Sequence, residues 1–147
     1  MLHQNPPDDE LRQLLTDART IAVVGASSNP DRSSHGVMGK LLRVGYRVFP
    51  VNPNETKVLG LEAYPSLAAV PEAIDIVDVF RRPEYTPAIA DDAVQVGARL
   101  LWLQQGIVNE DAAARAARGG LIVVMDACLA VMHSVLRVPT RAPTGER

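Results

Sequence analysis

The sequence of 147 residues has little of what marks secreted, membrane-spanning or nucleic-acid-binding proteins. Its single cysteine, Cys128, allows neither an intramolecular disulfide nor a cluster of thiolate ligands for zinc. Its apolar runs are short, whereas a membrane-spanning helix needs about 20 consecutive apolar residues. Lys and Arg number 15 against 17 Asp and Glu, so there is no basic excess for nucleic acid. We therefore expect a soluble, cytoplasmic protein without a membrane or nucleic-acid partner.

The N-terminal residues 1–10 also lack the basic region and apolar core of a secretory signal. A hydrophobic fraction of 47% and a charged fraction of 22% are typical of globular domains. At this length we expect one domain over residues 1–147, with its core in residues 8–137. The Pro- and charge-rich segment 138–147 is expected to be a mobile tail.

Short apolar runs alternate with segments of helical periodicity along the whole chain. The runs predicted as strands are residues 20–24, 47–51, 75–80, 99–103 and 121–125. The segments predicted as helices are 8–18, 37–44, 83–97 and 109–118, with a short helix within 66–71 and a loop over 52–57. This alternation predicts an α/β three-layer sandwich, with a five-stranded parallel sheet and helices on both faces.

The stretch from Thr20 to Gly36 is a buried strand, a loop of small residues and the start of a helix. The loop, Gly25 to Ser28, has little side-chain bulk. Backbone N–H groups in such a loop, followed by a helix N-terminus, can hold a phosphate. Alone, the pattern fits an ordinary tight turn equally well.

In open parallel sheets, ligands bind beyond the carboxyl ends of the strands, where the strand order reverses. The segments that follow the predicted strands are therefore the candidate site. They are Gly25–Ser28, Asn52–Asn54 with Lys57, Phe80–Arg82, Gln104–Gly106 and Asp126–Cys128. Small residues, amides and cations dominate this set, which suits a phosphorylated nucleotide.

The sequence departs from the common nucleotide-binding fingerprints. Ser27 and Pro30 stand where a G-x-G-x-x-G motif has its second and third glycines, and Asn52 stands where an NAD site has an acidic residue. No G-x-x-x-x-G-K-[ST] motif for ATP occurs. Lys57 lies where it could reach a phosphate on a ribose, with Arg81 and Arg82 as further partners. A ligand with a pyrophosphate and an additional ribose phosphate fits best.

These residues together resemble a known family. The matching segments are Val24–Ser27 with Asn29–Arg32, Gly45–Val48 with Pro50–Pro53, Val77–Arg81, Leu101–Gln104 with Gly106, and Val124–Asp126 with Cys128. They resemble the CoA-binding domain family, small stand-alone bacterial proteins similar to the N-terminal domain of the succinyl-CoA synthetase alpha subunit. The resemblance covers about residues 8 to 137 and implies coenzyme A, or an acyl-CoA, in a Rossmann-like fold.

The resemblance also implies roles for single residues. The Gly25–Ser28 loop would cradle the pyrophosphate, Lys57 matches a lysine that contacts CoA in the synthetase, and Leu103–Gln105 match a segment lining the same site. Ala127 replaces the arginine of the family's Asp-Arg-Cys motif. Taking the strand ends and the resemblance together, the residues expected to contact the ligand are Gly25, Ala26, Ser27, Ser28, Arg32, Ser33, Asn52, Pro53, Lys57, Phe80, Arg81, Leu103, Gln104, Gln105, Gly106, Asp126 and Cys128.

Other titratable residues have weaker patterns. Three scattered histidines and one cysteine have no metal-ligand spacing, so we expect no metal site. Asp78 is expected to point to a strand end or a loop, which leaves Asp126 as the carboxylate near the ligand. Cys128 is either a small buried hydrophobe or a thiol facing the thiol end of the ligand.

The sequence favours non-catalytic CoA binding in a carrier, sensor or regulatory protein, with no catalytic residues of its own. The alternatives are an enzyme or enzyme subunit acting on an acyl-CoA thioester, and an NAD(P)-binding redox sensor. A homo-oligomer and a separate protein partner both remain open.

Overall fold

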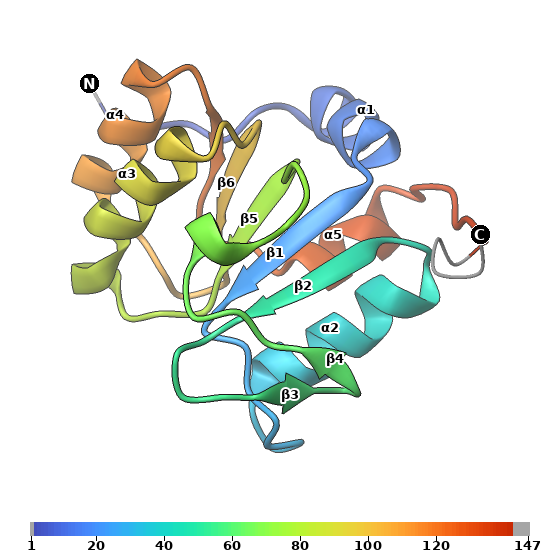
Figure 1. The fold of residues 1–147 in the computed structure, drawn as a ribbon. Coiled ribbons are helices and arrows are strands. Elements are labelled where there is room, and N and C mark those ends of the chain that lie inside the picture. Colours follow the sequence, from blue (N-terminus) through green and yellow to red (C-terminus); the bar gives the residue numbers. More distant parts are fainter. Residues whose placement is uncertain (1, 143–147) are drawn as a thin grey trace.

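A five-stranded parallel sheet forms the middle layer of the molecule (Figure 1). The computed structural model describes residues 2–142. The strands are β1 (Thr20–Val24), β2 (Arg47–Val51), β5 (Ile76–Val79), β6 (Leu100–Leu103) and β7 (Ile122–Val124), in the spatial order β2-β1-β5-β6-β7. Every neighbouring pair is parallel. The predicted α/β architecture is confirmed.

Helices cover both faces of this sheet (Figure 1). One face carries α1 (Asp8–Asp17), α2 (Ser33–Arg43) and α5 (Leu129–Val135), and the other carries α3 (Thr86–Gln95) and α4 (Glu110–Arg118). The side chains of β1 alternate between the two resulting cores: Ile21 and Val23 enter the first, Ala22 and Val24 the second. Burial on both faces explains why β1 is apolar from Ile21 to Val24 and does not alternate with polar residues.

The structure differs from the predicted elements at three places. The loop expected over residues 52–57 runs into a hairpin of two short strands, β3 (Lys57–Val58) and β4 (Leu61–Glu62). The helix expected over 83–97 divides into a 3₁₀ turn, η2 (Pro83–Tyr85), and α3. Helix α5 had no predicted counterpart. The short helix expected within 66–71 is the 3₁₀ turn η1 (Leu67–Ala69).

The C-terminal segment that the structure describes lies against the body of the protein. Val138 is buried, and the backbone N–H of Arg141 donates to the carbonyl of Val44 at 2.9 Å. The guanidinium of Arg141 donates to the carbonyls of Thr16 and Ala18 at 3.3 and 2.7 Å. Val138 and Arg141 thus hold the start of the expected tail against the protein. Residues 143–147 lie outside the described residues, so their mobility stays a prediction.

Within residues 2–142, none of the helices has the length and hydropathy needed to cross a membrane.

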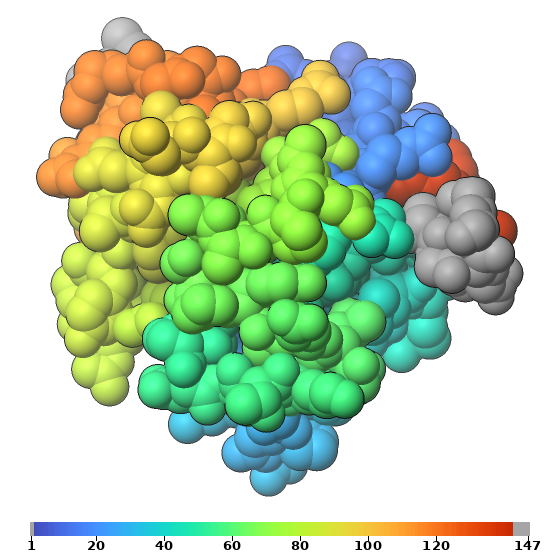
Figure 2. Space-filling model, in the orientation of Figure 1, coloured from blue at the N-terminus to red at the C-terminus, as the bar shows by residue number. Residues whose placement is uncertain are grey.

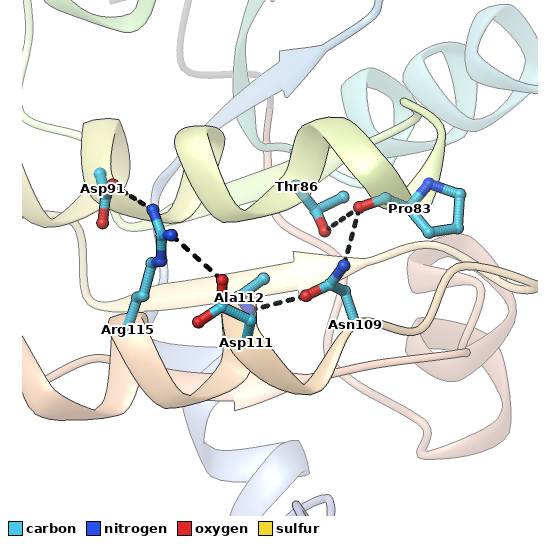
Figure 3. Close-up of polar contacts among 7 residues, drawn as sticks. All are labelled: Pro83, Thr86, Asp91, Asn109, Asp111, Ala112 and Arg115. Atoms are coloured by element: carbon cyan, nitrogen blue, oxygen red, sulfur yellow. Dashed lines mark hydrogen bonds and ion pairs between the residues drawn. The ribbon is translucent and has the colours of Figure 1, made fainter.

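A polar cluster joins α3 to α4 and fixes the turn between β5 and α3 (Figure 3). The side chain of Asn109 caps α4 by accepting the N–H of Ala112 at 2.9 Å, and its amide donates to the carbonyl of Pro83 at 3.1 Å. The hydroxyl of Thr86 donates to the same carbonyl at 2.7 Å. Arg115, the sixth residue of α4, reaches Asp91 of α3 at 2.7 Å. Asn109 thus couples the start of α4 to the turn after β5.

We expect Asn109→Ala to lower the free energy of unfolding by about 1 kcal/mol, because the N-terminal N–H groups of α4 lose their cap. Asn109→Asp is the matched control, since it keeps the capping oxygen and loses only the donor to Pro83. Urea denaturation of the three proteins measures the difference. An Asn109→Ala variant as stable as the wild type would contradict the capping role.

Asp78 lies in β5, within the predicted strand 75–80, and we expected its side chain to point to a strand end or a loop. That expectation was wrong. Its side chain is fully buried, on the sheet between Val23 and Trp102, and within the described residues neither carboxyl oxygen has a hydrogen-bond partner. Burial raises the pKa of Asp78 well above its ordinary value, because the charged form loses its hydration. The folded protein therefore favours the neutral acid.

This burial predicts a pH dependence of stability. The folded-state pKa exceeds the unfolded one, so stability is highest below the unfolded pKa of about 3.9 and falls as the pH rises toward the folded value. Asp78→Asn removes the titrating group and should be more stable than wild type at neutral pH, with the difference shrinking toward pH 4. Urea denaturation between pH 4 and 8 tests this, with the exposed Asp31→Asn as control. A pH-independent difference between Asp78→Asn and wild type would refute the assignment.

Candidate functional site

The order of the strands creates a cleft at their carboxyl ends. From β1 the chain crosses by α2 to β2 on one side, whereas from β5 it crosses by α3 to β6 on the other. The loops after β1 and β5 consequently diverge, which is where ligands bind in sheets of this kind. The cleft has a volume of about 460 Å³. It is lined by Gly25, Ser27, Arg32, Ser33, Ser34, Asn52, Phe80, Arg81, Arg82, Gln104, Gln105 and Ile107.

Gly25 lets the chain turn sharply at the floor of this cleft. Its φ is +88°, and a Cβ atom at this position would lie 2.7 Å from the carbonyl oxygen of Phe80. Its N–H donates to the carbonyl of Val51 at 2.9 Å. Only glycine combines this conformation with so close an approach to another backbone. Gly25, at the end of β1, therefore contacts the backbone at the ends of both β2 and β5.

The first turn of α2 faces the cleft with Ser33 and Ser34. Among the described residues, none caps this end of the helix with a side chain, and its first turn holds no acidic residue. The N–H of His35 donates to the carbonyl of Arg32 at 3.1 Å, whereas the positive end of the helix dipole and the N–H groups of Ser33 and Ser34 are available to an anion in the cleft. Arg32, immediately before the helix, adds a cation at the same place.

Asn52 joins the loop after β1 to the segment after β2. Its side-chain amide donates to the carbonyl of Ala26 at 2.9 Å, and its oxygen accepts the N–H of Asn54 at 2.9 Å. Both ends of the side chain are therefore engaged with backbone. At this position an acidic residue would hold ribose hydroxyls in a dinucleotide site, and Asn52 supports loop geometry instead.

A second, more apolar cleft of about 290 Å³ adjoins the first. Its lining residues are Val24, Val51, Pro53, Pro65, Ser66, Leu67, Arg81, Tyr85, Ala88, Ile89 and Asp92. Arg81 lines both clefts, and its guanidinium carbon lies 4.8 Å from the centre of the Tyr85 ring. This cation–π contact holds a positive charge at the junction of the two clefts.

The structure brings together part of the predicted site. Residues of the prediction that line the first cleft are Gly25, Ser27, Arg32, Ser33, Asn52, Phe80, Arg81, Gln104 and Gln105. Pro53 lines the second cleft. The buried Gln104 also fixes its neighbourhood, because its side-chain oxygen accepts the N–H of Leu129 at 3.5 Å.

The other predicted residues line neither of these two clefts. Ala26 and Leu103 are fully buried and serve the hydrophobic core. Lys57 is exposed on β3, and Cys128 is half-buried just before α5. Gly106 and Asp126 bond to each other, the carboxylate of Asp126 accepting the N–H of Gly106 at 2.8 Å.

Ser28, the last residue of the predicted phosphate loop, is exposed and directed elsewhere. Its N–H and hydroxyl both donate to Glu55, at 2.8 and 3.0 Å. These hydrogen bonds lower the pKa of Glu55, because they favour its charged form. The protein's own Glu55 carboxylate thus occupies two hydrogen-bond donors of the loop.

Three cleft residues were absent from the predicted set: Ser34, Arg82 and Ile107. Arg82 was recognised as a possible cationic partner but left out. Ser34 had a usable signal, because the residues that open a helix after such a loop face the ligand together. Ile107 follows the turn after β6 and belongs to a pair of apolar residues with Val108, too short to show a pattern that marks a site.

Comparisons with known proteins give a consistent picture. A family model described as CoA binding domain matches residues 19–134. The uncharacterized protein YneT of Bacillus subtilis (strain 168) is 42% identical over 134 residues, which are 91% of this chain and 99% of that protein. A hypothetical protein from Pyrococcus horikoshii OT3 has a solved structure that superposes with a TM-score of 0.88 at 38% identity, covering 93% of this chain and 99% of that one.

A larger enzyme contains a similar unit. The apo structure of a dinucleotide-forming acetyl-coenzyme A synthetase from Ca. Korarchaeum cryptofilum matches with a TM-score of 0.67 at 28% identity. The match covers 76% of this chain and only 26% of the synthetase. The resemblance noted in the sequence is confirmed by the family model: this chain belongs to the CoA-binding domain family.

Proposed function

We propose that this protein binds coenzyme A, free or as an acyl-CoA, in the cleft after β1 and β5, and acts as a carrier, sensor or regulatory protein without catalysis of its own. The observation that carries the proposal is the lining of that cleft: loop residues Gly25 and Ser27, the uncapped start of α2 and three arginines, Arg32, Arg81 and Arg82. Backbone donors at the start of α2 and guanidinium groups in one cleft suit a diphosphate.

The two adjoining clefts divide the ligand into a charged and an apolar part. The pyrophosphate occupies the first cleft, and the adenine occupies the second, between Pro53 and Ile89 beside Tyr85. Arg81, at the junction, pairs with the phosphates that link the two parts. Lys57, which follows the cleft residues Asn52 and Pro53 on the same segment, is the partner of the ribose phosphate.

A binding role fits the state of the carboxylates around the cleft. Asp126 accepts a backbone N–H, Glu55 accepts two donors from Ser28, and Asp78 is buried in the sheet. Use of Asp126 or Glu55 as a general base would first break these hydrogen bonds, and Asp78 is closed off from a substrate by its burial. Both ends of the Asn52 amide are engaged with backbone, so this side chain is not available to hold the ribose hydroxyls of NAD.

A second candidate is a module of a CoA ligase whose catalytic residues lie on another chain. The match to one quarter of an acetyl-coenzyme A synthetase favours it. The two candidates share the cleft and the ligand. They differ in one outcome: a ligase module, combined with its partner subunit, would form or cleave the thioester of an acyl-CoA, and a carrier or sensor would not.

Titration calorimetry with CoA, dephospho-CoA, NAD, NADP and ATP tests the proposed ligand. We expect CoA to bind most tightly and dephospho-CoA more weakly, because the ribose phosphate is lost. Tighter binding of NADP than of CoA would overturn the proposal in favour of a redox sensor. An acyl-CoA that is hydrolysed or transferred by the purified chain would overturn the non-catalytic role.

Lys57→Ala is expected to weaken CoA binding by about 1 to 2 kcal/mol, the scale of a charge-assisted hydrogen bond, with less effect on dephospho-CoA. Arg118→Ala is the matched control, because it removes an exposed cation from the last turn of α4, away from the clefts. Calorimetry of both variants with both ligands gives the comparison. Equal losses for CoA and dephospho-CoA would exclude Lys57 as the partner of the ribose phosphate.

A further inference from the structure

Hydrogen bonds outside the hydrophobic core connect the loop after β1 to the segment after β2. The backbone N–H of Ser28 and its hydroxyl donate to one and the same oxygen of Glu55, at 2.8 and 3.0 Å. Ser28 is exposed and Glu55 is half-buried. In Figure 2 the loop (light blue) projects at the bottom of the view beside the segment after β2 (teal). The contact thus lies at the surface, at the edge of the cleft.

The arrangement of donors around Glu55 is one that a phosphate oxygen also uses. A backbone N–H and a serine hydroxyl converge on a single anionic oxygen, as they do in phosphate-binding loops. Within the same loop, Gly25 and Ser27 line the cleft, whereas Ser28 does not. The protein's own carboxylate therefore occupies one end of the loop while the other end faces the cleft.

The charge of Glu55 matters as well as its position. The hydrogen bonds from Ser28 lower the pKa of Glu55, so the side chain is an anion at neutral pH. A phosphate that enters the loop meets a like charge at its rim, which is unfavourable. The ligand reaches the Ser28 donors only when the carboxylate leaves them.

If the Glu55 side chain moves away from Ser28, the other hydrogen bonds of the two segments stay in place. Asn52 holds Ala26 through its own hydrogen bond, and the N–H of Glu55 donates to the carbonyl of Asn52 at 3.2 Å. A rotation of one side chain is sufficient to free both Ser28 donors, with no movement of the backbone.

We propose that Glu55 is an internal competitor for the phosphate loop: its carboxylate occupies the Ser28 donors in the ligand-free protein and is displaced by an anionic group of the bound nucleotide. This inference rests on the proposed function, since it concerns the affinity of the same site. It makes Glu55 a residue that weakens ligand binding.

Glu55→Gln tests the competition, because glutamine keeps the length of the side chain and removes its charge. We expect the variant to bind CoA roughly two- to fivefold more tightly, the range for one partly exposed charge interaction. Asp31→Asn is the matched control: it removes one negative charge from the same loop without touching Ser28. Unchanged or weaker binding by Glu55→Gln, or an equal gain in Asp31→Asn, would overturn the competition.

A second measurement separates this proposal from the proposed function. Inorganic pyrophosphate is titrated into ¹⁵N-labelled wild type and Glu55→Gln, and the amide resonance of Ser28 is followed. Competition predicts a tighter transition at Ser28 in the variant, whether or not CoA is the natural ligand. If the wild type fails to bind CoA while this difference is seen, only the proposed ligand fails. If Ser28 responds alike in both proteins, or in neither, the competition is wrong.

Discussion

The contact between Gly25 and the carbonyl of Phe80 is the constraint on which the site depends. A side chain at residue 25 would stand 2.7 Å from that carbonyl oxygen. The N–H of Gly25 donates to Val51 at the end of β2, at 2.9 Å, and the N–H of Phe80, after β5, donates to Val24 at the end of β1, at 2.8 Å. The ends of all three strands are thus joined. From these joined ends, the chain leaves β1 toward β2 on one side and leaves β5 toward β6 on the other, so the two loops diverge. That divergence makes the cleft and directs the start of α2 into it.

Polar side chains fix the loops around this joint, so that the cleft is formed before a ligand arrives. Asn52 holds the loop after β1, Asp126 holds the turn after β6, and Asn109 holds the turn after β5. Each of them forms a hydrogen bond with a backbone group in these loops. The cations of Arg32, Arg81 and Arg82 are then set at the edges of a rigid frame. A preformed site of this kind loses less ordering entropy when it binds a flexible nucleotide.

The layers of the fold could be read from the sequence because they depend on local patterns. The short apolar runs that became β1 and β6, and the capping sequence before α4, carry their signals in a few adjacent residues. The β3–β4 hairpin could not be read this way, since its strands are too short to show a period and its turn uses Leu59 with a φ of 52°. The direction of the Asp78 side chain was wrongly predicted, because burying a carboxylate without a partner is costly and therefore unexpected.

The site was predictable only in part, for a geometric reason. Strand order determines which loops meet, and the residues next to each strand end, such as Gly25 and Arg81, followed from that rule. Whether a side chain enters the cleft depends on contacts made far along the chain. The engagement of Ser28 by Glu55 and of Gly106 by Asp126 is of that kind. Sequence position alone gives no information about either pair.

The central claim is that the ligand binds where β1 and β5 end. Mapping amide chemical shifts while CoA is added to the ¹⁵N-labelled protein tests it most directly. The account predicts the largest changes at Gly25, Ser27, Ser33, Ser34 and Arg81. Changes confined to the amino ends of the strands, at Arg19, Thr20 and Asp75, would contradict it.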